Sequence, residues 1–273
     1  MPTPAAISVA GSDPSGGAGI QADLKTFSAL GVYGGAVITA LTAQNTRGVT
    51  GVFPVPGSFV AEQLEALFDD LDVRVIKTGM LGGADSVRAV VEAIVRYDVP
   101  FVVVDPVMVA TSGDRLVSDE TVEVIRDELV PLATVVTPNL PEAATLLDLP
   151  DLDAEHAAAA AMALHQLGPA AVVKGGHDDG PDAVDVLVDD DGALELRVQR
   201  IHTRNTHGTG CTFASAIAAG LAQDLPLRQA VDEAKQYITE ALRAADQLDV
   251  GSGHGPVHHF QAWWKLAGVE EAR

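Results

Sequence analysis

Short apolar runs alternate with longer amphipathic segments along most of this 273-residue chain. Strands that are buried on both faces of a sheet consist of such apolar runs, and the helices that cover them are apolar on one side. The alternation therefore indicates an α/β fold with a mostly parallel central sheet flanked by helices. No internal repeat or long linker interrupts the pattern, so we expect a single domain over residues 1–273.

The expected secondary structure follows from the positions of these runs. Strands are expected at residues 7–10, 36–40, 73–78, 101–105, 134–137 and 170–174, with a short extended piece at 51–55. Helices are expected at residues 21–30, 58–70, 86–97, 119–129, 140–147, 154–167, 212–222 and 227–247, with Ser58 as an N-cap. Residues 184–188 and 194–198 flank an Asp-Gly pair, which predicts a hairpin.

Composition narrows the classes of partner. The formal net charge of −21 argues against nucleic acid and against an anionic membrane surface, because both favour a basic face. An anionic ligand would need local positive potential from helix N-termini and from the few lysines. Hydrophobic residues make up 47% of the chain but aromatic residues only 4%, so Ala, Val and Leu must fill the core.

The same counts bear on location. A single cysteine excludes an intramolecular disulfide and fits a reducing compartment. No uninterrupted apolar run is long enough to span a membrane, and residues 1–6 lack the basic region of a signal peptide. We therefore expect a cytoplasmic protein.

The sequence Asn-Thr-His-Gly-Thr-Gly-Cys at residues 205–211 precedes an Ala-rich run that is expected to be helical. Gly208 and Gly210 allow a sharp turn and close approach of a ligand, and the following helix N-terminus favours an anion. Cys211 falls in the first helical turn, where a thiolate is stabilised and the thiol pKa is lowered. The segment predicts a phosphate site with a titratable residue. Taken alone, the segment is better explained by a common glycine turn beside an inert buried cysteine, and it is the rest of the chain that favours the functional interpretation.

Four polar residues follow the expected strands. Asp105, Asn139 and Lys174 stand at strand ends, and Glu142 lies one turn into a helix. Ligands of open α/β sheets bind beyond the carboxyl ends of the strands, and carboxylates with a lysine suit magnesium and nucleotide phosphates. Each residue also has a purely structural interpretation: Asp105 can simply end a strand, and Asn139 with Glu142 can cap a helix.

The first glycine-rich loop, residues 11–19, superficially suggests dinucleotide binding, but it lacks a convincing fingerprint. Asp23 and Gln44 instead suggest the polar groups of a small substrate pocket. The alternative for Asp23 is a solvent-facing position on a helix.

Motifs along the whole chain resemble the hydroxymethylpyrimidine and phosphomethylpyrimidine kinases of thiamine biosynthesis, which belong to the ribokinase-like superfamily. In chain order they are GSDPSGGAGIQADLKT, TALTAQNT, KTGML, DPVMVATSGDRL, TPNLPEA, VVKGGH and NTHGTGCT. The similarity runs from Ile7 to Phe260. It implies a three-layer sandwich and a homodimer. The implied reaction is the Mg²⁺- and ATP-dependent phosphorylation of 4-amino-5-hydroxymethyl-2-methylpyrimidine and of its monophosphate. A pyridoxal or pyridoxine kinase on the same fold is the alternative.

The resemblance also implies roles for individual residues. Gln44 would hydrogen-bond the aminopyrimidine, in a pocket lined by Gly11, Ala18, Asp23, Met80 and Val107. Asp105 and Glu142 would organise magnesium, with Asn139 close to the phosphates. Lys174 and Lys235 would lie near the nucleotide.

The glycine turn has implied catalytic roles as well. Thr209, Gly210 and Gly208 would form the anion hole, and Cys211 would accept the proton of the substrate hydroxyl. Thr111 departs from the family, in which many members have a lysine at this position, so the contribution of residues 110–113 to phosphate binding is left open.

Near the C-terminus, residues 251–259 contain several histidines but no convincing set of metal ligands, so we expect a packed loop. Trp263 and Trp264 are expected to hold the C-terminus by packing.

Overall fold

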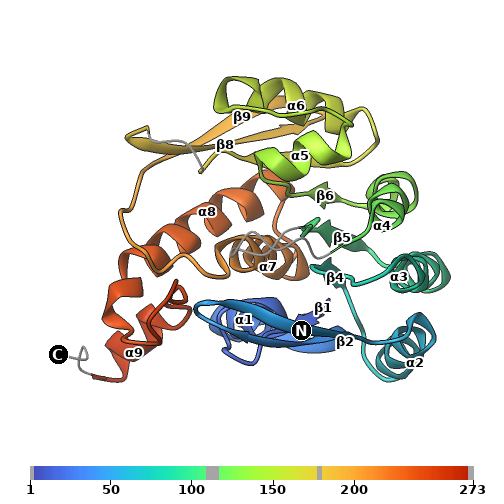
Figure 1. Ribbon diagram of the computed structural model, residues 1–273, viewed down its shortest axis with the longest axis horizontal. Coiled ribbons are helices and arrows are strands. Elements are labelled where there is room, and N and C mark those ends of the chain that lie inside the picture. Colours follow the sequence, from blue (N-terminus) through green and yellow to red (C-terminus); the bar gives the residue numbers. More distant parts are fainter. Residues whose placement is uncertain (1–2, 109–116, 177–179, 270–273) are drawn as a thin grey trace.

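The computed structural model describes residues 3–108, 117–176 and 180–269. These residues form a nine-stranded sheet in the order β3-β2-β1-β4-β5-β6-β7-β8-β9 (Figure 1). Its parallel part consists of β1 (Ala5–Ser12), β2 (Tyr33–Asn45), β4 (Val75–Thr78), β5 (Phe101–Val104), β6 (Val135–Val136) and β7 (Ala170–Lys174). The antiparallel strands are β3 (Gly48–Pro54), β8 (Asp182–Asp189) and β9 (Gly192–Gln199). The mostly parallel sheet predicted from the sequence is confirmed.

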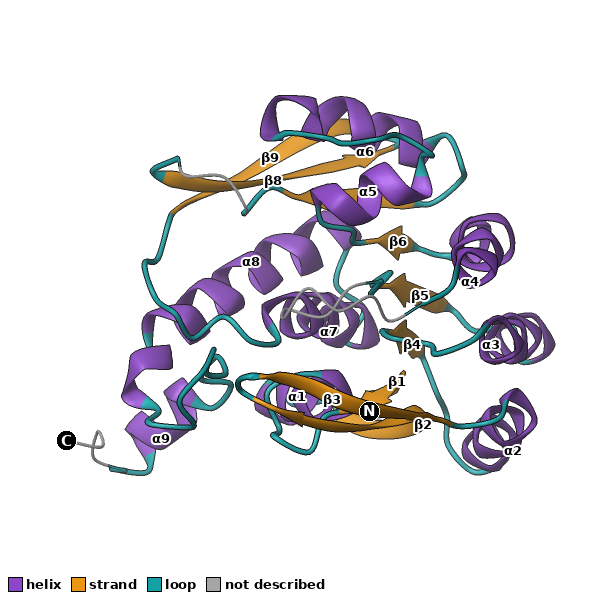
Figure 2. Ribbon diagram, in the orientation of Figure 1, coloured by secondary structure: helices purple, strands orange, loops and turns teal. Residues whose placement is uncertain are grey.

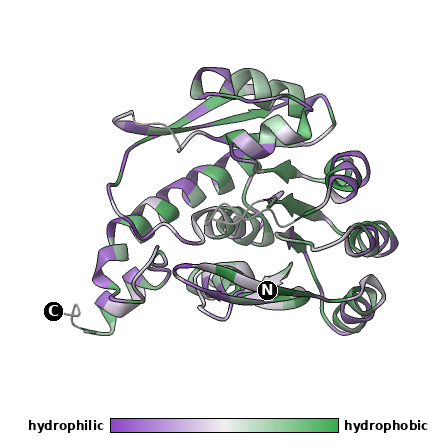
Figure 3. Ribbon diagram, viewed as in Figure 1, coloured by the Kyte–Doolittle hydropathy of each residue, from purple (hydrophilic) through white to green (hydrophobic). Residues whose placement is uncertain are grey.

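Helices cover both faces of the sheet and complete three layers (Figure 2). One face carries α2 (Gly57–Phe68), α3 (Ala84–Arg96), α4 (Asp119–Val124), α5 (Leu140–Leu146) and α6 (Ala157–His165). The other carries α1 (Gly19–Ala29), α7 (Thr209–Ala222) and α8 (Leu227–Arg243). One apolar core lies on each face of the sheet, and the central strands are mainly hydrophobic (Figure 3).

The helix α7 is the most deeply placed of these helices. Every residue from Thr212 to Ala222 is buried, against β1, β4, β5 and the neighbouring helices α1 and α8. Small side chains make this possible: a Cβ on Gly220 would come within 2.8 Å of the Cβ of Ala230 in α8. The Ala-rich sequence therefore brings the N-terminus of α7 to the carboxyl ends of the central strands.

The helix starts and ends differ from the sequence predictions in several places. Ser58 is not the N-cap of α2, because the helix begins at Gly57 and the N–H of Gly57 donates to Asp85 Oδ2 at 2.9 Å. This capping carboxylate comes from α3, so no neighbouring residue in the sequence indicates it. A six-residue helix, α9 (Gln261–Leu266), was not predicted.

Three expected helices are broken. The segment 119–129 is α-helical only to Val124 and continues as a π turn, Ile125–Leu129, just before Pro131. A 3₁₀ turn, Ala154–His156, precedes α6, and another, Ala245–Gln247, follows α8.

Strands β1 and β2 are both longer than their apolar runs. In β2 the additional residues are polar and pair with β3 outside the core. None of the helices within residues 3–108, 117–176 and 180–269 combines the length and the apolar character that crossing a bilayer requires.

Candidate active site

A cavity of about 1010 Å³ lies at the carboxyl ends of the parallel strands. It brings together all of the site residues predicted from the sequence except Asp23. These are Gly11, Ala18, Gln44, Met80, Asp105, Val107, Asn139, Glu142, Lys174, Gly208, Thr209, Gly210, Cys211 and Lys235. Residues far apart in the sequence thus share one cavity because the ends of the parallel strands meet at the same edge.

The segment 205–211, which we call the anion turn, leads into α7. Gly208 is the N-cap and has φ +79°, and a Cβ there would overlap the carbonyl oxygen of Gly17, so only glycine fits. Within the described part of the chain, no acceptor bonds the N–H of Gly210 or of Cys211. Two backbone donors at a helix N-terminus are therefore available to an anion in the cavity.

The environment of Cys211 contradicts one sequence expectation. The helix terminus was expected to lower the pKa of the thiol, but burial raises it to about 11, and the attraction of Lys77 offsets only part of this effect. The protein around the sulfur desolvates a thiolate more strongly than the helix end stabilises it. The resting form of Cys211 at neutral pH is therefore the thiol, to which the N–H of Gly19 is directed.

Asp105 lies next to the anion turn, directly after β5. Its Oδ1 accepts a hydrogen bond from Lys174 Nζ at 2.9 Å, and the Thr137 hydroxyl lies 3.3 Å from the same oxygen. Its Oδ2 is buried and has no hydrogen-bond partner among the residues described. A Cβ on Gly210 would lie 3.3 Å from Lys174 Nζ and 3.8 Å from this Oδ2. The carboxylate and the ammonium thus lie close to the free amides.

Glu142 and Asn139 fulfil the structural interpretation that the sequence left open. The Asn139 side chain accepts from the N–H of Glu142 at 2.9 Å, and Glu142 Oε2 accepts from the N–H of Asn139 at 2.8 Å, which is a capping box at the start of α5. Both residues also line the cavity, so the cap and a role in binding are compatible.

The charge of Glu142 is strongly perturbed. Burial raises the pKa of Glu142 to about 7, and attraction to Lys174, whose Nζ is 3.9 Å away, opposes the rise only in part. Burial would lower the pKa of Lys174, but Asp105 and Glu142 together raise it, so Lys174 stays charged.

The family model described as phosphomethylpyrimidine kinase matches residues 13–258. The chain belongs to this family. Hydroxymethylpyrimidine/phosphomethylpyrimidine kinase from Rhizobium meliloti is 52% identical over 265 residues, which cover 96% of this chain and 99% of the relative.

Two solved structures of kinases are similar to this chain over most of its length. An ADP complex of Bacillus subtilis pyridoxal kinase has a TM-score of 0.89 at 36% identity and covers 96% of this chain and 99% of its own. Phosphomethylpyrimidine kinase from Clostridium difficile has a TM-score of 0.77 at 41% identity, covering 87% and 99%. The fold is ribokinase-like, as the sequence predicts.

The prediction that Asp23 lines the substrate pocket of this phosphomethylpyrimidine kinase family member is wrong. The alternative, that Asp23 faces solvent, is wrong as well. Asp23 is fully buried in α1, outside the cavity lining. Its carboxylate accepts from Lys77 Nζ at 2.9 and 3.0 Å, and from the hydroxyls of Ser8 and Ser215. All of its acceptor capacity is directed into the protein, so Asp23 ties α1 to β4 and α7 rather than holding substrate.

Lys235 lines the cavity, but its ammonium already has a partner. Nζ lies 2.7 Å from Asp185 Oδ2, and both side chains are buried. Asp185 Oδ1 in turn accepts from the N–H of Gly175 at 3.1 Å. Asp185 was missed in the sequence because a single acidic residue within a β-hairpin resembles a solvent-exposed position. The role of Lys235 near the nucleotide remains a prediction.

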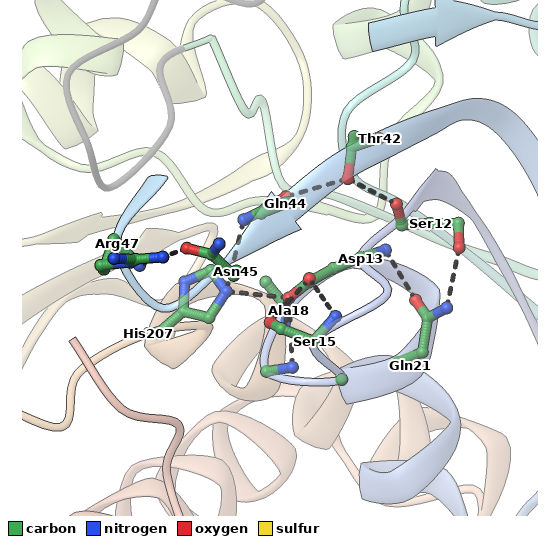
Figure 4. A network of polar contacts seen from close by, with 12 residues as sticks. Ser12, Asp13, Ser15, Ala18, Gln21, Thr42, Gln44, Asn45, Arg47 and His207 are labelled. Atoms are coloured by element: carbon green, nitrogen blue, oxygen red, sulfur yellow. Dashed lines mark hydrogen bonds and ion pairs between the residues drawn. The ribbon is translucent and has the colours of Figure 1, made fainter. Parts of the chain in front are cut away.

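A polar network around Gln44 includes two residues that sequence reasoning missed, Asp13 and His207 (Figure 4). His207 Nε2 lies 2.8 Å from Asp13 Oδ2 and 3.3 Å from Gln44 Nε2. Burial alone would raise the pKa of Asp13, but hydrogen bonds from His207 and Ser15 lower it to about 2. Asp13 and His207 both stand inside motifs that carried the family resemblance, and this was the available signal.

The C-terminal loop is packed, as expected. Gly253 and Gly255 leave no room for a side chain against Thr46 and Asn205, so the loop connects the end of β2 with the anion turn. Trp263 Nε1 donates to Ala29 O at 3.1 Å, although the residue is 54% exposed. Thr111 lies outside the described residues.

Proposed function

We propose that this protein transfers the γ-phosphoryl group of ATP to the hydroxymethyl group of 4-amino-5-hydroxymethyl-2-methylpyrimidine, and then a second one to the resulting monophosphate. Both steps belong to thiamine biosynthesis. Family membership and 52% identity to the Rhizobium meliloti enzyme support the substrate. The observation that carries the chemistry is the pair of free amides at Gly210 and Cys211 beside Asp105 and Lys174.

Phosphoryl transfer depends mainly on positioning and on stabilising charge. In this proposal the N–H groups of Gly210 and Cys211 receive the charge on the transferred group, in line with the helix dipole of α7. The substrate oxygen forms its bond to the γ-phosphorus as the bond to the ADP oxygen breaks. The ammonium of Lys174 adds fixed positive charge beside them, and the ADP complex of the similar Bacillus subtilis kinase supports a nucleotide in this cavity.

The side chains present also fit Mg²⁺. Asp105 Oδ2 is a buried, unpartnered carboxylate oxygen among the described residues, and Glu142 supplies a second carboxylate. Magnesium uses few protein ligands and shares its other positions with water and phosphate. When bound, Mg²⁺ would neutralise phosphate charge. Asp105 and Glu142 would hold it, and its charge would favour the ionised form of Glu142.

Cys211 is the proposed acceptor of the substrate hydroxyl proton. The thiol is the resting form and cannot accept a proton, so the acceptor is the small thiolate fraction, and the hydroxyl proton moves to it late, when the new oxygen–phosphorus bond has made the hydroxyl acidic. A loose transition state tolerates this order, because little bond formation precedes departure of the ADP oxygen.

Product identification tests the function directly. The protein is incubated with Mg²⁺, ATP and one of three substrates: the pyrimidine alcohol, its monophosphate or pyridoxal. Mass spectrometry then gives the masses of the products. We expect one added phosphate on the alcohol and a second on the monophosphate. Pyridoxal kinase activity is the second candidate, favoured by the TM-score of 0.89 to the Bacillus subtilis enzyme. Phosphorylation of pyridoxal alone would replace the proposal.

The proposal includes a homodimer. Leu41 of β2 and Phe53 of the edge strand β3 face each other across the strands and are 49% and 68% exposed. An apolar pair at an open sheet edge favours contact with another chain. Sedimentation equilibrium of the wild type and of Phe53→Asp tests this, with a monomeric variant expected.

We also place the enzyme in the cytoplasm, where its single free cysteine, Cys211, stays reduced.

A further inference from the structure

Two lysine–aspartate ion pairs line the cavity, and the proposed mechanism uses only one of them. Lys174 Nζ lies 2.9 Å from Asp105 Oδ1, and Lys235 Nζ lies 2.7 Å from Asp185 Oδ2. Both side chains of the second pair are more than nine-tenths buried. A buried ion pair is weak evidence of stabilisation, because desolvation offsets the attraction between the charges. The second pair therefore needs an explanation other than stability.

The strand pairing places the two ion pairs next to each other. Lys174 at the end of β7 and Asp185 in β8 are directly opposite in the antiparallel register. Val172 and Leu187, two residues from each of them, belong to the core between the sheet and helices α7 and α8. Because side chains alternate along a strand, Lys174 and Asp185 project from this same face. Residues directly opposite have Cβ atoms about 4.5–5.5 Å apart, so the Asp185 carboxylate is within reach of the Lys174 side chain.

The Asp185 carboxylate also turns toward the backbone that follows Lys174. Its Oδ1 accepts a hydrogen bond from the N–H of Gly175 at 3.1 Å. A Cβ on Gly175 would overlap the carbonyl oxygen of Val184, so the backbones of the two segments are in close contact here. Asp185 is therefore a second acceptor available to the Lys174 ammonium, in competition with Asp105.

Lys235 supplies the charge that removes this competition. It projects from the buried face of α8, and its ammonium occupies the second oxygen of Asp185. Without that ammonium, Asp185 would be a buried carboxylate with only the N–H of Gly175 to stabilise it, which is strongly unfavourable. Lys174 has a long and flexible side chain that bonds Asp105 through a single oxygen, so it can move to the unpaired carboxylate opposite it.

We infer that Lys235 neutralises Asp185 so that the ammonium of Lys174 stays bonded to Asp105, beside the free amides of the anion turn. Lys235 is a positioning residue: it acts on Lys174 through Asp185, and this role requires no contact between Lys235 and a nucleotide. The inference rests on the proposed function, in which Lys174 supplies fixed positive charge near the phosphates. It explains why the buried face of α8 carries a charge where a hydrophobic side chain of similar size would fit.

Nucleotide binding by single and double variants tests the inference. The probe is ADP with Mg²⁺, titrated into each protein and followed by calorimetry. Lys235→Met leaves Asp185 unpaired, which draws Lys174 away from the phosphates, so the affinity for ADP should fall about tenfold. Asp185→Asn removes the competing charge and should bind ADP within about threefold of wild type. The double variant should regain the affinity that Lys235→Met loses, again to within about threefold of wild type.

The double variant distinguishes this role from a direct contact with the nucleotide. If Lys235 touched the nucleotide, Lys235→Met and the double variant would bind ADP equally weakly, and that result would overturn the inference. Unchanged affinity in Lys235→Met would overturn it as well. Lys235→Gln replaces Lys235→Met where the latter does not fold, because glutamine still donates to Asp185 but carries no charge. It should lose about threefold in affinity and recover when combined with Asp185→Asn.

Arg228→Met is the matched control. Arg228 and Asp189 form an ion pair between the same two elements, α8 and β8, but neither residue lines the cavity. The variant also leaves an aspartate of β8 without its cation, at a position from which it cannot compete for Lys174. Its affinity for ADP should therefore stay within about twofold of wild type. A loss as large as that of Lys235→Met would show a general effect of loosening α8, and would overturn the inference.

Crystal structures of the wild type and of Lys235→Met decide the question without any measurement of catalysis. The ammonium of Lys174 should bond Asp105 in the wild type and Asp185 in the variant, and an ammonium that stays on Asp105 in the variant would overturn the inference. The proposed function fails separately, if wild type phosphorylates neither the pyrimidine alcohol nor its monophosphate. The position of Lys174 remains measurable in that event.

Discussion

Lys174 and Asp105 form an ion pair that uses only one of the two carboxylate oxygens. Lys174 Nζ lies 2.9 Å from Oδ1, whereas Oδ2 is buried without a hydrogen-bond partner in the described part of the chain. A buried carboxylate oxygen that lacks a partner is costly, so its presence at the cavity argues for a ligand that completes the site.

This relationship predicts the effect of Asp105→Asn. The amide keeps the shape of the side chain but removes the charge that would hold Mg²⁺ and pair with Lys174. We expect kcat to fall about 100-fold and the Mg²⁺ concentration for half-maximal velocity to rise. Steady-state kinetics with a Mg²⁺ titration measures both. Asp127→Asn, which alters an exposed pair with Arg126, is the matched control. Activity of Asp105→Asn within about twofold of wild type would contradict the assignment.

Cys211 should give the reaction a characteristic pH dependence. Only the thiolate accepts a proton, and with a pKa of about 11 its fraction rises about tenfold per pH unit throughout the neutral range. The single-turnover rate should therefore rise with pH from about 7 to 9.5 without a plateau. Cys211→Ala should be slower by about 100-fold at the upper end, independent of pH, and unchanged in ATP affinity. The same pH profile in both proteins would remove Cys211 as the acceptor.

The two glycines of the anion turn should respond differently to alanine. Gly208→Ala combines φ +79° with overlap of the Gly17 carbonyl, and should lower the free energy of unfolding by more than about 2 kcal/mol. Gly31→Ala is its control, because Gly31 has φ +78° but open space around it. Urea unfolding of the two variants separates the steric overlap from the backbone conformation. Equal destabilisation would show that the Gly17 contact is unimportant.

Gly210→Ala places a methyl group 3.3 Å from Lys174 Nζ, at ordinary backbone angles. The fold should tolerate it within about 1 kcal/mol, because Lys174 is long and can shift. The KM for ATP should rise severalfold, since the methyl group crowds the phosphate position. An unchanged KM would place the phosphates elsewhere in the cavity.

The extent of successful prediction has a physical pattern. Parallel strands buried on both faces have continuous apolar runs, so the sheet and the residues at its carboxyl edge, such as Asp105 and Lys174, followed from the sequence. The glycine turn before α7 could also be predicted from the sequence, because its backbone geometry requires glycine at residue 208. At Asn139 the structure shows the capping box, and the role near the phosphates that the family motifs imply stays a prediction.

Long-range partners were beyond the sequence. The sequence shows that Asp23 is polar, which predicts a place in the pocket. It does not show that Lys77, 54 positions later, is the partner of Asp23. The thiol pKa was predicted in the wrong direction because a helix terminus is apparent in sequence but desolvation is not. The contact of His207 with Asp13 spans 194 positions and depends entirely on the tertiary fold.

Glu142→Gln should alter stability with a definite sign. The folded-state pKa of about 7 lies above the ordinary value of 4.5, so the native protein resists ionising Glu142 while the unfolded chain does not. The wild type therefore loses stability relative to the variant as pH rises from about 4.5 to 7, by up to about 3 kcal/mol. Glutamine preserves the capping box. Urea unfolding of both proteins from about pH 5 to 8 measures the difference, and a constant gap between them would contradict the raised pKa.

The buried pair of Lys77 and Asp23 provides the last prediction. Both side chains are completely inaccessible, and attraction to Asp23 outweighs the burial that would lower the pKa of Lys77, and raises it. Lys77→Met leaves a buried carboxylate without its cation and should cost about 3–5 kcal/mol. In the double variant with Asp23→Asn, a neutral amide can still bond Ser8 and Ser215, and much of that loss should be regained. Additive losses in a double-mutant cycle of urea midpoints would instead show that the two charges are not coupled.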